Sequence, residues 1–164
     1  MGLVYAAPYS GTITNSGGNA DLFSCQPADD KPVSLRGMLL SQISEVADAA
    51  EEGLRITLQD LVATFTVGSG GSAITATRPP ASPAGPTWAS TVRGNDTTVG
   101  TTSGTAASYG EIGWNIRNSP LDLWYPDERF CLLVKQGSGL IVRLETTPAD
   151  DLTGCFTFWF EEHA

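Results

Sequence analysis

The sequence predicts an all-β protein built as a two-sheet β-sandwich, of which the jelly roll is one form to consider. Long loops rich in Gly, Pro and Thr connect its strands. Apolar residues recur with a period of two, which is the pattern of strands. Residues that favour turns are frequent, and alternating helix-strand units are absent, which argues against a parallel α/β fold. We expect eight to ten strands in one domain covering residues 1–164.

The first long strand is expected over residues 34–44, with each face marked by its own apolar set: Leu35, Leu39 and Ile43 on one side, Met38 and Leu40 on the other. Residues 45–53 are rich in Ala but too short for a stable helix, so we expect a loop or one helical turn there.

Residues 52–59 alternate strictly, which predicts a strand with Leu54, Ile56 and Leu58 inward and Arg55, Thr57 and Gln59 outward. A β-branched run at 62–67 follows. Further strands are expected at 110–116, 130–135, 140–145 and 155–162. Residues 146–153 carry turn formers, which predicts that the last two strands form a terminal hairpin.

Residues 68–108 form the extended loop region, because 68–87 and 90–108 lack apolar periodicity. This region is either a pair of arms that reach a neighbouring subunit or a solvated excursion. We favour arms, because Ile74, Trp88 and Val92 could dock, with Pro79 and Pro80 between them.

The chain is acidic, with 9 Lys and Arg against 18 Asp and Glu, a net charge of −9. Phosphate backbones and anionic membranes would repel it, so we expect neither nucleic acid nor membrane as a partner. The start lacks the features of a signal peptide, and no apolar stretch approaches the ~20 residues of a membrane span. Cys25, Cys131 and Cys155 make an odd count and are expected to be inert thiols of a protein made in a reducing host cytoplasm.

The residues offer little for catalysis, and we expect no catalytic residue, no cofactor and no metal site. The single histidine, His163, lies one residue from the C-terminus and is expected to be solvated. The glycine-rich run at 68–72 lacks the basic residue and helix of a phosphate loop. Acidic pairs occur at 29–30, 51–52, 127–128, 150–151 and 161–162, and a carboxylate dyad or a bound Ca²⁺ remains an alternative for them.

The tryptophans are the residues that best suit binding. Trp124 and Tyr125 stand beside Pro126 and could stack on a sugar or anchor a protein interface, unless they fill the core. Trp114 and Trp159 are expected in the core. The complete set of interface candidates is Ile74, Pro79, Pro80, Trp88, Val92, Trp124 and Tyr125.

Five short segments carry a resemblance to a known group of proteins: DAAEEGLRI at 48–56, GWNIRN at 113–118, YPDER at 125–129, TPAD at 147–150 and FWFEE at 158–162. In this order they resemble small virion-associated proteins of tailed bacteriophages, over roughly residues 35–162. After Glu162 the group's apolar residue and glycine are replaced by His163 and Ala164.

The resemblance implies a structural virion protein, and specifically an auxiliary capsid protein that cements or decorates the head surface. It implies two partners, the major capsid protein and further copies of this chain in a homotrimer. The alternative is a tail- or fibre-associated module that holds a host glycan through Trp124 and Tyr125. Neither function is enzymatic.

Overall fold

The computed structural model describes residues 2–14, 18–44, 52–78, 87–117 and 120–163. Strands make up nearly all of its regular structure, and the described residues include no α-helix. A single 3₁₀ turn, η1 (Glu128–Phe130), is capped by the Asp127 carboxylate, which accepts a hydrogen bond from the Arg129 N–H. The all-β prediction is confirmed.

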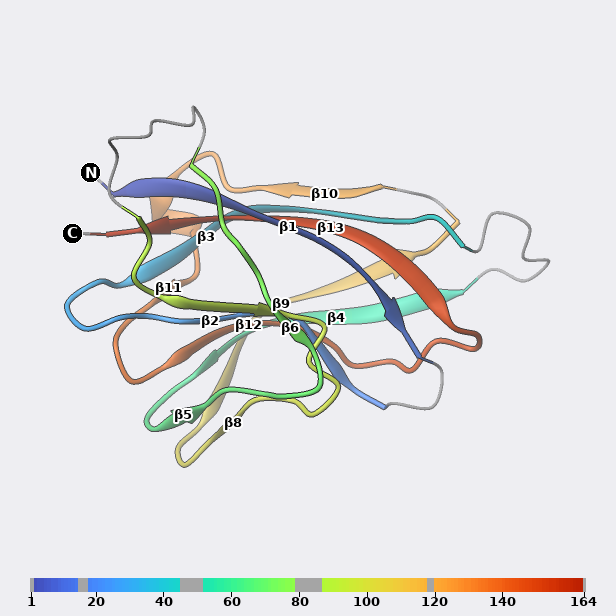
Figure 1. The fold of residues 1–164 in the computed structure, drawn as a ribbon, viewed down its shortest axis with the longest axis horizontal. Coiled ribbons are helices and arrows are strands. Elements are labelled where there is room, and N and C mark those ends of the chain that lie inside the picture. Colours follow the sequence, from blue (N-terminus) through green and yellow to red (C-terminus); the bar gives the residue numbers. More distant parts are fainter. Residues whose placement is uncertain (1, 15–17, 45–51, 79–86, 118–119, 164) are drawn as a thin grey trace.

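Two sheets pack face to face (Figure 1). The first sheet runs in the order β1 (Leu3–Ile13), β13 (Leu152–Glu162), β3 (Val33–Gln42) and β10 (Leu121–Trp124), with β11 (Leu133–Val134) also paired to β3. The second sheet runs β6 (Ser72–Ala73), β7 (Thr91–Gly94), β2 (Ala20–Gln26), β12 (Gly139–Leu144), β4 (Gly53–Leu61) and β9 (Ala106–Asn115). A small third sheet pairs β5 (Phe65–Thr66) with β8 (Thr101–Thr102).

The connectivity is that of a jelly roll. Four strands of the first sheet, β1-β13-β3-β10, face four strands of the second, β2-β12-β4-β9. Between consecutive members of this set the chain crosses from one sheet to the other at every step except β4 to β9, which are neighbours in the second sheet. That order is two Greek keys wound together, the arrangement of jelly-roll sandwiches.

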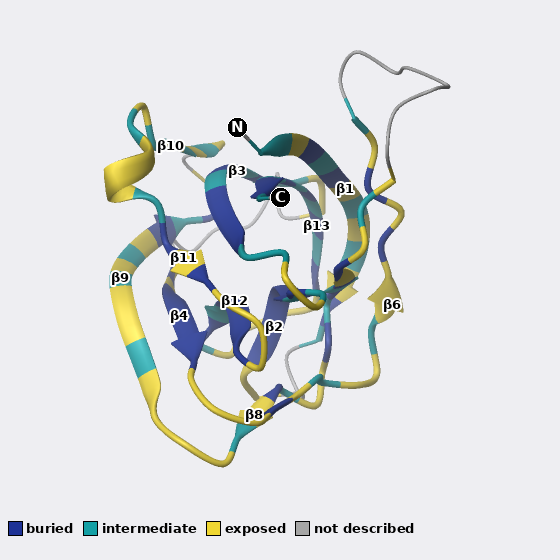
Figure 2. Ribbon diagram, turned by 90° about the vertical axis from the view of Figure 1, so that its left-hand side faces the viewer, coloured by how far each residue is buried: buried dark blue, intermediate teal, exposed yellow. Residues whose placement is uncertain are grey.

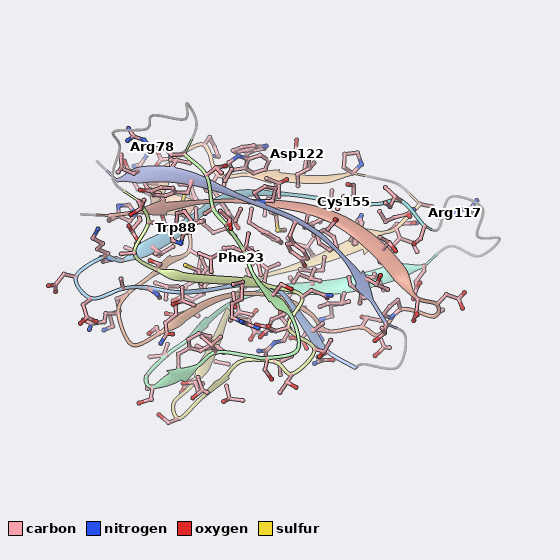
Figure 3. All side chains as sticks on the ribbon, in the orientation of Figure 1. Phe23, Arg78, Trp88, Arg117, Asp122 and Cys155 are labelled. Carbon is pink, nitrogen blue, oxygen red and sulfur yellow. The ribbon has the colours of Figure 1, made fainter. Side chains whose placement is uncertain are left out.

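Aromatic rings fill the space between the sheets. Phe23 stacks on Phe158 with ring centroids 4.6 Å apart, and Trp114 packs edge-on to Phe156 at 6.2 Å. The three phenylalanines of β13 at positions 156, 158 and 160 are all buried, as their alternation predicts. Figure 3 shows Phe23 in the middle of the sandwich, and Figure 2 shows β2, β4 and β12 mostly in the dark colour of buried residues.

The predicted terminal hairpin is wrong. β12 pairs with β2 and β4 in the second sheet, whereas β13 pairs with β1 and β3 in the first. Residues 145–151 therefore carry the chain across the sandwich. Alternation identified both strands, but it carries no information about which strands pair.

The faces of β3 also differ from the prediction, because the strand contains a bulge. Trp159 pairs with Gly37 and Phe160 with Leu35, which leaves Arg36 as an extra residue. Leu35 is therefore buried on the same side as Met38 and Leu40, while Leu39 faces outward. Ile43, placed with Leu35 in the prediction, lies beyond the strand and is 63% exposed.

Strand β4 confirms Leu54, Ile56 and Leu58 as inward residues. Its outward Thr57 and Gln59 were expected to be exposed, but both are buried. Gln59 donates to the Thr57 hydroxyl at 2.7 Å, and both donate to the Glu145 carboxylate at 2.9 Å. The outer side of β4 is therefore polar and buried at Thr57 and Gln59, while Arg55 stays exposed. The expected loop or turn at 45–53 lies mostly outside the described residues.

Candidate docking surface

Two rows of residues lie on the outer face of the first sheet, and they include two tryptophans. The register places Pro8 beside Thr157, then Leu39, then Asp122; the adjacent row runs Ala6, Trp159, Gly37 and Trp124. These residues alternate with the buried ones on each strand, so they share the face away from the core. Figure 3 shows Asp122 and Cys155 on this upper side of the molecule.

Two tryptophans dominate this face. The rings of Trp124 and Trp159 lie 4.5 Å apart, centre to centre, at 34°. Trp124 is 52% exposed. Gly37 separates the two strands that carry them, and a Cβ at this position would lie 2.7 Å from Trp124 Cε3. The missing side chain of Gly37 lets the indole of Trp124 lie down on the sheet.

The apolar surface continues toward η1 and β11. Leu133, 57% exposed, pairs with Ser34, which is an outward residue of β3 opposite Glu161. Phe130, 70% exposed, ends η1 between β10 and β11. We call Trp124, Trp159, Leu39, Phe130 and Leu133 together the tryptophan face. Large exposed apolar side chains gathered in one area are typical of an interaction site.

Charges on and beside this face are mostly paired. Arg36, the bulge residue, places its guanidinium 3.4 Å from Glu161 and donates to Cys131 Sγ at 3.5 Å. Arg129 pairs with Asp127 at 2.6 Å, and the hydrogen bonds from Arg129 lower the pKa of the Asp127 carboxyl. Paired charges around an apolar centre resemble the rim of a protein interface.

His163 is not a solvated terminal residue, which corrects that expectation. The backbone N–H of His163 donates to the Pro32 carbonyl at 2.8 Å. The imidazole Nε2 of His163 lies 2.9 Å from Ser34 Oγ. Nδ1 lies 4.0 Å from Glu161 Oε1. The order Ser, His, Glu resembles a catalytic relay, but 4.0 Å exceeds hydrogen-bond reach and Ser34 is 2% exposed. In this arrangement a substrate would not reach the serine hydroxyl.

The outer face of the second sheet is covered over β2 and β12, whereas Arg55 and Glu111, on β4 and β9, stay exposed. Described residues between β4 and β9 fold back across the covered part and add β7 and β6 beside β2. Asp21 on β2 accepts from Arg143 Nε at 2.6 Å and from the Gly100 N–H at 2.6 Å. Arg143 in turn donates to the Gly100 carbonyl at 2.8 Å. Burial outweighs these partners and raises the pKa of the Asp21 carboxyl.

A second buried carboxylate holds the same segment. Asp96 is fully buried and accepts from Arg93 Nη2 at 2.7 Å and from the Gly71 N–H at 3.1 Å. At the other end, Glu162 accepts from the Ser90 hydroxyl at 2.7 Å and the Ser90 N–H at 2.9 Å. The described parts of the 68–108 region are thus fastened to their own domain, which contradicts the expectation of arms reaching a neighbour.

The seven interface candidates differ in how far the structure exposes them. Ile74 and Val92 are buried in the core of their own chain, and Trp88 packs against that core. Pro79 and Pro80 lie outside the described residues. Tyr125 is half-buried against the core, and its N–H donates to the Arg36 carbonyl at 3.0 Å. Of the described candidates, Trp124 is the one that is mostly exposed.

Sequence reasoning missed most of the tryptophan face. Trp159 was expected in the core, although its position opposite the phenylalanines of β13 already placed it on the other side of the strand. Trp114 is buried, as predicted. Leu133 and Phe130 were expected within one apolar strand, and the 3₁₀ turn that exposes Phe130 has no strong local signal.

The described ranges contain no group of three or more His, Cys, Asp or Glu side chains that could hold a metal ion. Cys25, Cys131 and Cys155 are all free thiols. Over the same part of the chain, no helix has the length and apolar character needed to cross a lipid bilayer.

Comparison with known proteins gives little. No protein-family model matches the chain, and no curated protein matches it. Among solved structures, a chain from the crystal structure of the IBDV viral particle aligns with 96% of this chain and 38% of its own length, at 14% identity and a TM-score of 0.20. This chain therefore spans well under half of that viral protein. A TM-score of this size does not establish a shared fold.

Proposed function

We propose that this chain is a structural virion protein of a tailed phage, a cement protein that binds the head shell through its tryptophan face. The observation that carries the proposal is a contrast in exposure: Trp124 is 52% exposed and packs against Trp159 on the outer face of the first sheet, whereas other parts of the chain cover β2 and β12 on the outer face of the second. Tryptophan is the residue most enriched among the energetic centres of protein interfaces.

The segments that resemble phage virion proteins support the proposal by their positions. One of them, 158–162, carries Trp159, which packs against Trp124, the residue directly before the segment 125–129. The described parts of the other three meet at one end of the sandwich. There the Ile116 N–H donates to the Glu52 carbonyl at 3.1 Å, and the Ala149 N–H donates to the Glu52 carboxylate at 2.7 Å. The resemblance thus gathers at two surface areas.

The jelly roll itself does not decide between a shell protein and a glycan-binding module, because viral capsid and lectin domains both use it. The size of the tryptophan face favours a protein partner. Leu133 and Phe130 add two further exposed apolar side chains on β11 and η1, whereas a sugar needs one or two aromatic rings.

Binding to purified heads that lack this chain tests the proposal. We expect saturable binding in a fixed ratio to the major capsid protein, with hundreds of copies per particle. Trp124→Ala should weaken it at least tenfold, because an interface centre contributes about 2 kcal/mol or more. Tyr109→Ala is the matched control: Tyr109 is 63% exposed on β9, away from the tryptophan face, and its loss should leave binding unchanged.

Two results would count against a cement role. A few copies per particle would indicate a tail component, and loss of host-glycan binding in Trp124→Ala, with head binding unchanged, would support the fibre module. A solution mass three times that of the 17.3 kDa chain would support the homotrimer, and a monomer would remove that part of the proposal.

A further inference from the structure

A groove of about 270 Å³ lies along the free edge of β1, on the side of the sandwich away from β10. One wall is residues 8–11 of β1, and the other is residues 70–75, which lead into and out of β6. β1 is the edge of the first sheet and β6 is the edge of the second. The groove is therefore a gap between two sheet edges.

Hydrogen bonds close the groove at both ends. At one end the Ala6 N–H donates to the Thr77 carbonyl at 2.7 Å, and the Thr77 N–H donates to the Ala6 carbonyl at 2.8 Å. At the other, the Asn95 side-chain amide donates to the Thr12 carbonyl at 2.8 Å. The six residue steps between Ala6 and Thr12 span about 20 Å of strand.

The groove opens where the backbone pairing between β1 and the segment that contains Thr77 stops. Continuing the antiparallel Ala6–Thr77 pair by two residues would bring Pro8 opposite Thr75. Pro8 has no N–H to donate, so that pair cannot form both of its bonds. The strand opposite turns toward β7 instead, where the Ile74 N–H donates to the Val92 carbonyl at 3.0 Å.

Main-chain groups on both walls point into the gap. The backbone groups of alternate residues point to the same strand edge, and Ala6 and Thr12 both bond on the outer edge of β1. The Ser10 N–H and the Pro8 and Ser10 carbonyls therefore face the groove. On the other wall, Thr77 faces β1 while Ile74 faces β7, which turns Ala73 and Thr75 toward the groove. Among the described residues, no backbone hydrogen bond crosses the gap between its closed ends.

The walls suit a backbone more than a side chain. Gly11, Gly70, Gly71, Ser72, Ala73 and Gly94 contribute much of the lining, and none of the twelve lining residues is charged. One buried polar atom of a lining residue, Asn95 Oδ1, has no hydrogen-bond partner. The volume lies below the ~300 Å³ of ordinary small-molecule pockets.

We propose that this groove is an acceptor site for an extended, uncharged peptide segment of three or four small residues, supplied by another protein and added as a strand between β1 and β6. Such a segment offers N–H and C=O groups at strand spacing to both walls, as in other cases of strand addition. The site does not overlap the tryptophan face, and the proposal stands whether or not the chain binds a head shell.

A peptide titration of the ¹⁵N-labelled full chain tests the site. The probe is acetyl-Ala-Ser-Ala-Thr-amide, which has four small uncharged residues and so matches the length and the lining of the gap. At about 1 mM peptide we expect amide shifts at Ser10, Ala73 and Thr75, and slower hydrogen exchange at Ser10. Unchanged amides at these positions, a Ser10 amide already protected in the free chain, or equal shifts with methyl glucoside would each overturn the proposal.

Variants make the same test specific. Ser10→Pro removes the N–H that faces the groove, and we expect at least tenfold weaker peptide binding, while Ser10→Ala, which keeps the N–H, should bind as the parent does. If Ser10→Pro does not fold, Thr75→Pro with Thr75→Val as its control removes a donor from the other wall. Parent-like binding by the folded proline variants would overturn the proposal.

Discussion

The inner faces of the two sheets are both apolar and buried, but their outer faces differ in how far other parts of the chain cover them. The first sheet leaves Trp124, Phe130 and Leu133 exposed. The second is covered over β2 and β12 by described residues between β4 and β9, which the carboxylates of Asp21 and Asp96 hold, while its β9 edge stays exposed. Buried ion pairs therefore hold a cover over the middle of the second sheet, whereas the first sheet keeps aromatic and aliphatic side chains exposed on its outer side.

The largest predicted loss of stability comes from the buried ion pair between Asp21 and Arg143 on the second sheet. Asp21→Asn leaves Arg143, whose side chain is 12% exposed, without its carboxylate, and the loss of one partner of a buried pair costs about 3–5 kcal/mol. Urea unfolding measures this change. Hydrogen exchange at Gly100, whose N–H donates to Asp21, should accelerate at the same time.

Two companions sharpen this prediction. Asp21→Leu combined with Arg143→Met removes both charges and should restore most of the stability, because a buried ion pair contributes little over apolar side chains of similar size. Asp127→Asn breaks the exposed pair with Arg129 and should leave unfolding unchanged. A full loss in the double variant would mean that Asp21 acts through Gly100 and not through Arg143.

On the outer face of the first sheet, Gly37→Val should lower the free energy of unfolding by a moderate amount. The new Cβ would lie 2.7 Å from Trp124 Cε3 and 2.8 Å from the Leu123 carbonyl oxygen, so the indole must lift from the sheet. Crowding of this kind costs about 1–3 kcal/mol. Tryptophan fluorescence should change as the contact with Trp159 is lost, and head binding should weaken as in Trp124→Ala.

Gly113→Val is the control, because a Cβ on Gly113 of β9 would meet no atom within 4 Å. A β-branched residue suits an exposed strand position, so this variant should be neutral or slightly stabilising. If both glycine variants behave alike, Gly37 has no special role in placing Trp124, and the open face does not depend on it.

The sequence predicts these two sides unequally, and the reason is physical. Period-two alternation is a local property, and it identified β4, β12 and β13 together with the residues that face the core, though not the burial of Thr57 and Gln59 on the outer side. Pairing is not local, so the link between β12 and β13 was misjudged as a hairpin. A single extra residue at Arg36 reverses the faces of β3 beyond it, and no pattern in the sequence marks that bulge.

The candidate site was harder to predict than the fold. Trp124 was identified because it stands in a cluster of aromatic and proline residues. Trp159 was assigned to the core because it lies among phenylalanines, although exposure depends on the strand face and not on the neighbours in sequence. The arms were misjudged because the acidic groups that hold them, Asp21, Asp96 and Glu162, lie far from them in the chain or look like ordinary loop charges.

The smallest predicted effect compares a buried with an exposed carboxylate on the second sheet. Burial raises the pKa of Asp60 above 3.8, and its Oδ1 atom has no hydrogen-bond partner. The folded state then holds the proton more tightly than the unfolded chain does, so stability falls as the pH rises from about 3.8 through the raised pKa. Asp60→Asn should remove this decline and leave the chain slightly more stable at neutral pH.

Glu111 should give the opposite dependence of stability on pH. The hydrogen bonds from Arg55, at 2.8 Å and 3.3 Å, lower the pKa of the Glu111 carboxyl below 4.5. The stability that this pair adds is present above pH 4.5 and is lost as the pH falls through the lowered pKa. Glu111→Gln should therefore lose a little stability at neutral pH, while Asp60→Asn gains a little. Urea midpoints of both variants between about pH 3 and 7 measure the two slopes, and slopes of the same sign would show that burial does not separate the two carboxylates.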